Sequence, residues 1–202
     1  MAPTKLLLCA ALCAMLAACA TTAPTASPAG RTVAPYSDSV QLSGRLSVNY
    51  QKDGKSESLS GKFTWRQSAE RTDVSLASPL GQTIATISVT PGEASLTRSG
   101  QPPRVAPDID TLSAQSLGWS LPVSGLRDWL QGYARQADGA RFVATPEHDS
   151  VTTADGWRLR FVSWQEGAPA TPRPKRIDAE RNGQEQADQI ALRIVLDAPA
   201  QP

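Results

Sequence analysis

Apolar or small residues alternate with polar ones in the stretch Leu42-Ser43-Gly44-Arg45-Leu46-Ser47-Val48-Asn49-Tyr50. Side chains of a β-strand point to its two faces in turn, so this pattern predicts a strand with one apolar and one polar face. The alternation recurs in residues 59–66, 72–76, 84–89 and 94–96. Short turn sequences separate these stretches, so we expect antiparallel pairing between successive strands. The turns are Asp53-Gly54, Pro79-Leu80-Gly81 and Pro91-Gly92.

The middle of the chain changes to a helical spacing. A first short helix has Asp108 or Asp110 as its cap and ends at Gly118. A second helix begins with Pro122, which suits a first helical position, and ends at Gly132. The apolar faces of the two helices consist of Ile109, Leu112, Leu117, Val123, Leu126, Trp129 and Leu130. Two short amphipathic helices therefore interrupt a β protein.

The last part of the chain returns to strands. Residues 157–161 and 190–196 alternate clearly, residues 141–143 weakly, and the Pro-rich residues 168–174 predict a loop. The whole pattern predicts a mainly β (α+β) fold. In this fold an incomplete, strongly curved antiparallel β-barrel carries a short-helix lid over a hydrophobic cavity. Periodicity leaves one alternative open, because a lid that seals the barrel fully would leave only a filled core.

Tryptophan is unusually frequent among the aromatic residues: the chain has five Trp, three Phe and three Tyr. These rings can fill a core or form the wall of a cavity that accepts acyl chains, since both roles use large rigid apolar surfaces.

The N-terminus predicts export and lipidation. Residues 1–18 have a basic start, a short apolar run and small residues before Cys19, as in a signal peptide. The run Leu-Ala-Ala-Cys resembles the lipobox of bacterial lipoproteins, which implies acylation of Cys19. An ordinary secretory signal that happens to end near a Cys is the alternative. Ala20, where an Asp would resemble an inner-membrane retention signal, favours the outer membrane.

The domain plan follows from composition. Residues 1–18 are a lipoprotein signal peptide, and residues 19–38 are the acylated Cys and a flexible Ala/Thr/Pro-rich tether. Residues 39–197 form the half-barrel domain, and residues 198–202 are a disordered tail.

The residue inventory argues against catalysis. The single histidine, His148, lacks partners for a metal site, and Asp108-Ile109-Asp110 is explained by a helix cap. Arg158 and Arg160 share one strand face, which suits solvent better than an anion site. The formal charge of +1 and the lack of a basic cluster argue against nucleic acid. We expect no enzyme activity, no metal and no cofactor.

Four motifs in order resemble the LolB family of outer-membrane lipoproteins. They are Phe63-x-Trp65, Ser78-Pro79-Leu80-Gly81, Leu121-Pro122-Val123-x-x-Leu126-x-x-Trp129-Leu130-x-Gly132 and Gly156-Trp157-x-Leu159-x-Phe161. The resemblance implies a monomer that accepts acylated lipoproteins from the periplasmic carrier LolA and places them in the inner leaflet of the outer membrane. With the apolar faces above, it implies an acyl-chain cavity lined by Phe63, Trp65, Val74, Leu76, Leu112, Leu126, Trp129, Leu130, Trp157, Leu159 and Phe161.

Leu80 occupies the third position of a turn that starts at Ser78, so a bulky apolar side chain sits at a hairpin tip. It can protrude or fold back onto the sheet. The resemblance implies a protruding loop, formed with Pro79 and Gly81, that engages the membrane during insertion. Two rivals remain: a lipoprotein that binds another amphiphile, such as a glycolipid or lipopolysaccharide, and a structural or assembly lipoprotein with a filled core.

Overall fold

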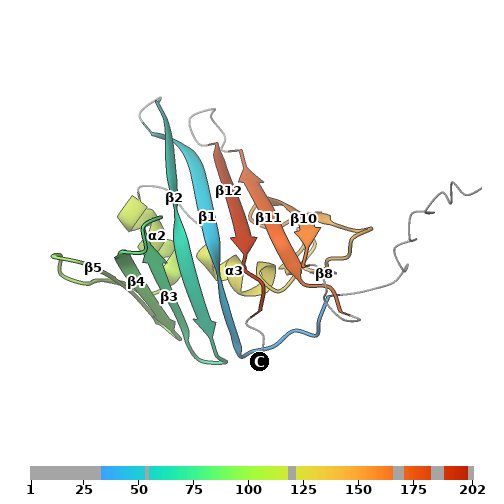
Figure 1. The fold of residues 1–202 in the computed structure, drawn as a ribbon, viewed down its shortest axis with the longest axis horizontal. Coiled ribbons are helices and arrows are strands. Elements are labelled where there is room, and N and C mark those ends of the chain that lie inside the picture. The colour runs from blue at the N-terminus through green and yellow to red at the C-terminus, as the bar shows by residue number, and fades with distance from the viewer. Residues whose placement is uncertain (1–32, 53–54, 118–121, 166–170, 183–188, 200–202) are drawn as a thin grey trace, which may run out of the picture.

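The computed structural model describes residues 33–52, 55–117, 122–165, 171–182 and 189–199 (Figure 1). One large sheet dominates it, formed by strands β1 (Val40–Lys52), β2 (Lys55–Gln67), β3 (Thr72–Ala77), β4 (Thr83–Thr90), β5 (Glu93–Arg98), β6 (Arg104–Ala106), β9 (Ser150–Thr152), β10 (Arg158–Trp164), β11 (Pro174–Arg181) and β12 (Ile190–Leu196). The remaining elements are α2 (Ile109–Leu117), α3 (Val123–Trp129) and the two-stranded sheet of β7 (Tyr133–Arg135) and β8 (Arg141–Val143).

The large sheet is antiparallel and open. Its strand order is β6-β5-β4-β3-β2-β1-β12-β11-β10-β9, so β1 to β6 form a meander and the last strand, β12, pairs with the first. The ends of the order, β6 and β9, are the sheet edges, and the barrel therefore stays incomplete. This confirms the predicted fold class, and it settles the pairing of the last strands as β10-β11-β12-β1.

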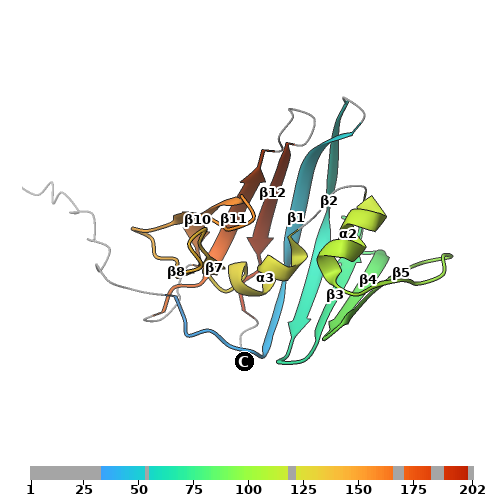
Figure 2. The ribbon, with the colours of Figure 1, turned by 180° about the vertical axis from the view of Figure 1, so that it is seen from behind.

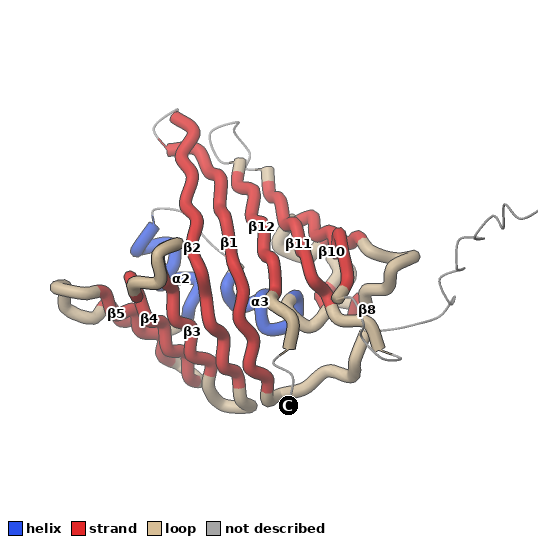
Figure 3. The backbone as a smooth tube through the Cα atoms, viewed as in Figure 1, coloured by secondary structure: helices blue, strands red, loops and turns tan. Residues whose placement is uncertain are grey.

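The two helices lie across one face of the sheet, as the view from behind shows (Figure 2). The same face carries the buried side chains. In β2, for example, Phe63 and Trp65 are buried while Lys62 and Thr64 are exposed. The alternation in the sequence thus separates a concave apolar face under the helices from a convex polar face. Figure 3 shows both helices on that one side of the strands.

Several features depart from the sequence-based expectation, among them the short strands β6, β7 and β9, which were not predicted. Strand β11 begins at Pro174, the last residue of the predicted loop, and was not predicted, because charged residues separate the buried positions Pro174, Ile177 and Ala179. The folded unit also extends to Val33, before the predicted start at residue 39. Val33 is buried, and the hydroxyl of Tyr133 donates to the carbonyl oxygen of Ala34 (2.7 Å).

Several predictions concern residues outside the described part of the chain. These are the signal peptide, Cys19, most of the tether, the turn at Asp53-Gly54, the helix end at Gly118 and the last residues of the tail. Among the described residues, no helix combines the length and the apolar character needed to cross a membrane.

Candidate functional site

The concave face brings the predicted acyl-chain residues together. All of them belong to one hydrophobic cluster, in which Leu76 and Leu126 are partly buried and the others are buried. The cluster is therefore a shared surface of the sheet and the helices, built from residues that lie far apart in the chain. In this structure these side chains pack against one another.

Two regions of the cluster have unlike side chains, an aromatic half and an aliphatic half, and Phe63 and Trp65 on β2 lie between them in the strand order. The aromatic half lies over β10 and consists of Trp129, Phe142, Trp157, Phe161 and Trp164. Its rings interlock: the Trp129 and Trp157 centroids are 6.0 Å apart, and Phe161 stacks with Phe142 at 6.1 Å and with Trp164 at 6.3 Å.

The aliphatic half is formed by β3, β4 and β5 together with α2, which packs on β5 and β6. It consists of Val74, Leu76, Ala85, Ile87, Leu96 and Leu112. Leu76 and Ile87 are only partly buried. Smaller side chains with residual exposure leave apolar surface that a ligand can cover.

Helix α3 is tied to the rim of the sheet by two polar side chains. The guanidinium of Arg127 donates to Thr72 Oγ1 (3.1 Å) and to the carbonyl of Ser68 (2.9 Å). The side chain of Gln131, just after the helix, donates to the carbonyl of Ser37 (3.0 Å) and accepts from its backbone N–H (2.9 Å). Ser68 and Thr72 lie at the β2–β3 turn and Ser37 lies before β1, so α3 is held at two separate places.

Helix α2 rests on β5 and β6 and is linked to α3 at its first turn. Asp110 accepts hydrogen bonds from the backbone N–H (3.2 Å) and the hydroxyl (2.5 Å) of Ser124. Asp108 is the helix cap: the Thr111 N–H donates to Asp108 Oδ1 at 2.7 Å, and this bond holds the pKa of Asp108 below its usual value. The sequence offered Asp108 or Asp110 as the cap of the first helix; the structure assigns the cap to Asp108 and places Asp110 inside α2, against the first turn of α3.

A cavity of about 470 Å³ opens where the segment before β1 meets the ends of β1, β12 and α3. Leu130 is the predicted cavity residue in its wall, and the other wall residues include Pro35, Leu42, Gln131, Arg173, Pro174 and Leu196. Sequence reasoning did not find this cavity, since its wall joins residues more than 150 positions apart, such as Leu42 and Leu196.

The β3–β4 turn presents Leu80 to solvent. The N–H of Gly81 donates to the carbonyl of Ser78 (2.9 Å), and Gly81 has a φ of +92°, which favours glycine. Leu80 is 92% exposed, so it protrudes and does not fold back onto the sheet. An isolated leucine this exposed gains apolar burial only from another molecule.

The fold and site define an open half-barrel with an apolar concave face, a helical cover and a protruding leucine. The model of the family described as Outer membrane lipoprotein LolB matches residues 38–198. The chain therefore belongs to the LolB family, as the sequence motifs predicted.

Individual relatives agree over nearly the whole length. The Outer-membrane lipoprotein LolB of Cupriavidus taiwanensis is 40% identical over 196 residues, covering 95% of this chain and 94% of the relative. The same-named protein of Cupriavidus necator is 41% identical over 184 residues, covering 91% and 90%. The predicted localisation is thereby confirmed: this is a lipid-anchored outer-membrane lipoprotein. Cys19 as the acylated residue stays a prediction.

Proposed function

We propose that this LolB-family protein, which acts in lipoprotein localisation at the outer membrane, accepts acylated lipoproteins from a LolA-like periplasmic carrier. It then inserts them into the inner leaflet of the outer membrane. The observation that carries the proposal is the single apolar cluster on the concave face, under two helices that are separate from the sheet. A surface of this kind can exchange its own side-chain contacts for contacts with acyl chains.

The physical chemistry of the cargo explains why such a surface is needed. Apolar area buried from water contributes about 25 cal/mol per Å², so exposed acyl chains face a large barrier to crossing the periplasm. A protein that covers the chains lowers this barrier. The bilayer buries the chains more completely than a half-barrel does, so the last transfer is downhill and needs no nucleotide.

The geometry favours entry of the acyl chains at the aliphatic half. Arg127 and Gln131 tie α3 to the rim, and the interlocked rings under it leave a rigid wall. By contrast, α2 packs on β5 and β6, beside a region in which Leu76 and Ile87 are only partly buried. Displacing α2 would open a path between the helix and the strands, with acyl contacts replacing those of Leu112.

Transfer from a loaded carrier tests the proposal. A radiolabelled lipoprotein bound to a LolA-like carrier is mixed with the mature chain and acceptor liposomes, and cargo is followed into each fraction. We expect the cargo to pass to this protein and then to lipid. If the carrier keeps its cargo in the presence of the correctly folded chain, the transfer function is wrong.

Leu80→Glu separates acceptance from insertion. A carboxylate at the exposed turn tip leaves the core untouched, so we expect normal folding and acceptance but at least tenfold slower release into liposomes, since a charge opposes entry into the apolar layer. Leu80→Phe is the matched control and should keep release close to that of the parent. Unimpaired release by Leu80→Glu would show that the turn has no membrane role.

A structural or assembly lipoprotein is the second candidate function. It is favoured by the tight packing of the aromatic half, where Trp157 and Phe161 are both 0% exposed. An apolar fluorescent probe distinguishes the two functions, since a permanently filled core takes up none of it. Saturable probe binding that a lipoprotein acyl chain displaces would support the transfer function.

A further inference from the structure

Arg45 and Lys62 differ from most other cations of the convex face. Arg66 lies opposite Asp73, and other cations of the face and its turns form ion pairs: Arg71–Asp73 (2.7 Å), Arg158–Glu180 (3.4 Å), Arg160–Asp149 (3.5 Å), Arg176–Asp178 (2.5 Å) and Arg193–Asp178 (3.3 Å). Arg45 and Lys62 are exposed and make no ion pair or hydrogen bond with any residue in the described part of the chain. Their charges are available to an external anion.

These two cations lie beside the base of the Leu80 turn. Arg45 on β1 is directly opposite Lys62 on β2, and Lys62 is directly opposite Ala77, the last residue of β3 before the turn. Two strand spacings, about 10 Å, therefore separate Arg45 from the base of the turn. Like charges directly opposite on a sheet repel each other, and an anion between them would remove this cost.

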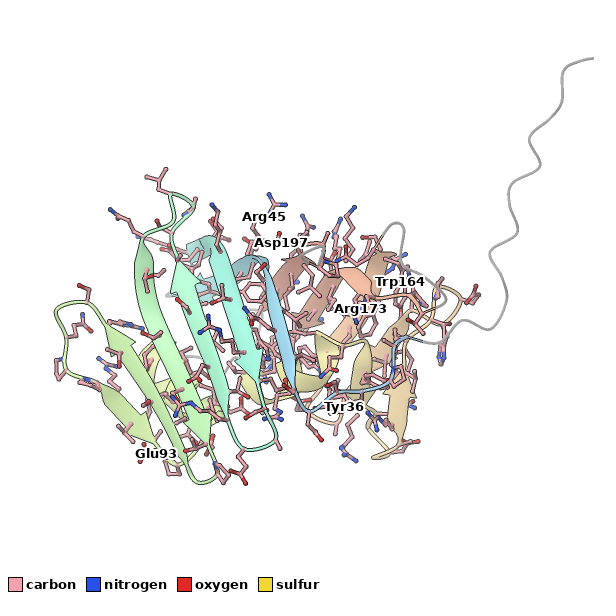
Figure 4. All side chains as sticks on the ribbon, turned by 60° about the horizontal axis from the view of Figure 1, so that its bottom comes forward. Tyr36, Arg45, Glu93, Trp164, Arg173 and Asp197 are labelled. Carbon is pink, nitrogen blue, oxygen red and sulfur yellow. The ribbon has the colours of Figure 1, made fainter. Side chains whose placement is uncertain are left out.

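The turn and Arg45 point the same way. Figure 4 shows Arg45 rising from β1 on the same side of the sheet as the β3–β4 turn. The pairing of β3 and β4 is irregular next to Ala77, where Ile84 is the extra residue. A bulge bends its strand, which accounts for a turn that leaves the sheet on the convex side.

We propose that Arg45 and Lys62 bind the phosphate groups of anionic phospholipids while Leu80 enters the apolar layer of the same bilayer. The inference rests on the membrane role of Leu80 proposed above. An apolar insert next to basic side chains is the combination that holds peripheral proteins on anionic membranes. Because the two cations have no partner to give up among the described residues, their whole charge is available to the lipid.

Vesicle binding tests the proposal without carrier or cargo. The mature chain from residue 19, with Cys19→Ala to remove the acyl anchor, contains every strand and helix of the structure. It is sedimented with phosphatidylcholine vesicles and with vesicles that contain about one third phosphatidylglycerol. Each basic residue near an anionic surface strengthens binding about fivefold, so Arg45→Gln with Lys62→Gln should weaken binding to the anionic vesicles about 25-fold.

Controls separate charge from position and from folding. Binding to phosphatidylcholine should not change in the double variant, whereas Leu80→Glu should weaken binding to both kinds of vesicle. Arg158→Gln with Arg160→Gln removes the same charge from the far end of the convex face and should change anionic binding less than twofold. Thermal melts by circular dichroism verify that every variant is folded.

The proposal is overturned if the Arg45/Lys62 variant binds anionic vesicles as the parent does, or if the Arg158/Arg160 variant loses as much. It is also overturned if the pair proves to hold the carrier protein, so that its removal weakens carrier capture and leaves vesicle binding unchanged. Because the assay lacks cargo, these failures leave the transfer function standing. Conversely, failed transfer with an intact preference for anionic vesicles would refute the transfer function and keep this site.

Discussion

The two halves of the concave face solve the same packing problem with different side chains. The aromatic half fills the space over β10 with rings whose centroids are about 6 Å apart, and Trp157 and Phe161 are completely buried there. The aliphatic half covers β3 to β5 with smaller residues and leaves Leu76 and Ile87 partly exposed. Apart from Trp164, which is partly buried, the aromatic half is thus a finished core, whereas Leu76 and Ile87 of the aliphatic half can still gain burial.

This difference matters for a protein that must hold and release a lipid. Residual apolar exposure is free energy that a ligand can recover, at about 25 cal/mol per Å². A helix whose apolar contacts an acyl chain can replace can move aside at low cost, whereas interlocked rings cannot. We therefore call the aromatic half the fixed wall of the concave face and the aliphatic half its replaceable wall.

The largest expected effect is the loss of a ring from the fixed wall. Trp157→Ala should reduce the free energy of unfolding by about 3–5 kcal/mol, because it leaves a large cavity in packed surroundings. Trp157→Phe should cost only about 1 kcal/mol, since the buried indole Nε1 has no acceptor among the described residues and no hydrogen bond is lost. Urea unfolding measures both values.

Ile87→Ala is the matched change in the replaceable wall. It should cost about 1 kcal/mol, since Ile87 is partly buried and less is lost on truncation. If Ile87→Ala destabilises the protein as much as Trp157→Ala, the two halves are equally packed and the comparison between them is wrong.

A smaller effect is expected from the link between the helices. Asp110→Ala removes both hydrogen bonds to Ser124, at a cost of about 1 kcal/mol. Because α2 is part of the replaceable wall, hydrogen exchange of residues 109–117 should accelerate about fivefold while β10 to β12 stay protected. Asp138→Ala is the control: it removes a similar bond to the Ala140 N–H (2.9 Å) in the β7–β8 turn, so α2 should exchange as in the parent. Equal acceleration of both regions would mean that the helices open only with the whole domain.

The sequence predicted the elements whose patterns are local. Alternation located β1 to β5, and helical spacing with an acidic cap located α2 with Asp108 at its start. The turn position of Leu80 also followed from Ser78 and Pro79. Each of these depends on residues a few positions apart, where sequence patterns carry direct physical meaning.

Long-range packing explains what the sequence did not predict. Strand β11 carries charged residues on most positions, and its ion pairs with β10 and β12 form only once these strands meet. Val33 lies against Gly132, and Tyr36 contacts Tyr133 and Gln67, all far along the chain, so composition indicated only a tether. Periodicity located the residues of the concave face but not the free volume between them, because it specifies which face a side chain occupies and not how tightly it packs.

The smallest expected effect concerns the convex sides of the two halves, which differ in their response to acid. Burial raises the pKa of Asp178 on β11, but the hydrogen bond from Arg176 and the charges of Arg176 and Arg193 outweigh it, so this pKa lies below its usual value. On β3 the hydrogen bond from Arg71 likewise lowers the pKa of Asp73. A carboxyl group whose pKa is lowered in the folded state stabilises the fold at pH values above its ordinary pKa. This contribution is lost as the pH falls through the folded-state pKa.

Asp178→Asn should therefore cost up to about 1 kcal/mol of unfolding free energy near pH 7, and the cost should vanish as the pH falls from about 5 towards 2. Asp73→Asn should show the same sign with a smaller amplitude, because the Asp73 carboxylate is 41% exposed and that of Asp178 is 25% exposed. Urea unfolding across this pH range measures both curves. A larger loss at Asp73 than at Asp178 would mean that the outer side of the replaceable wall is the more firmly held, which would reverse the comparison.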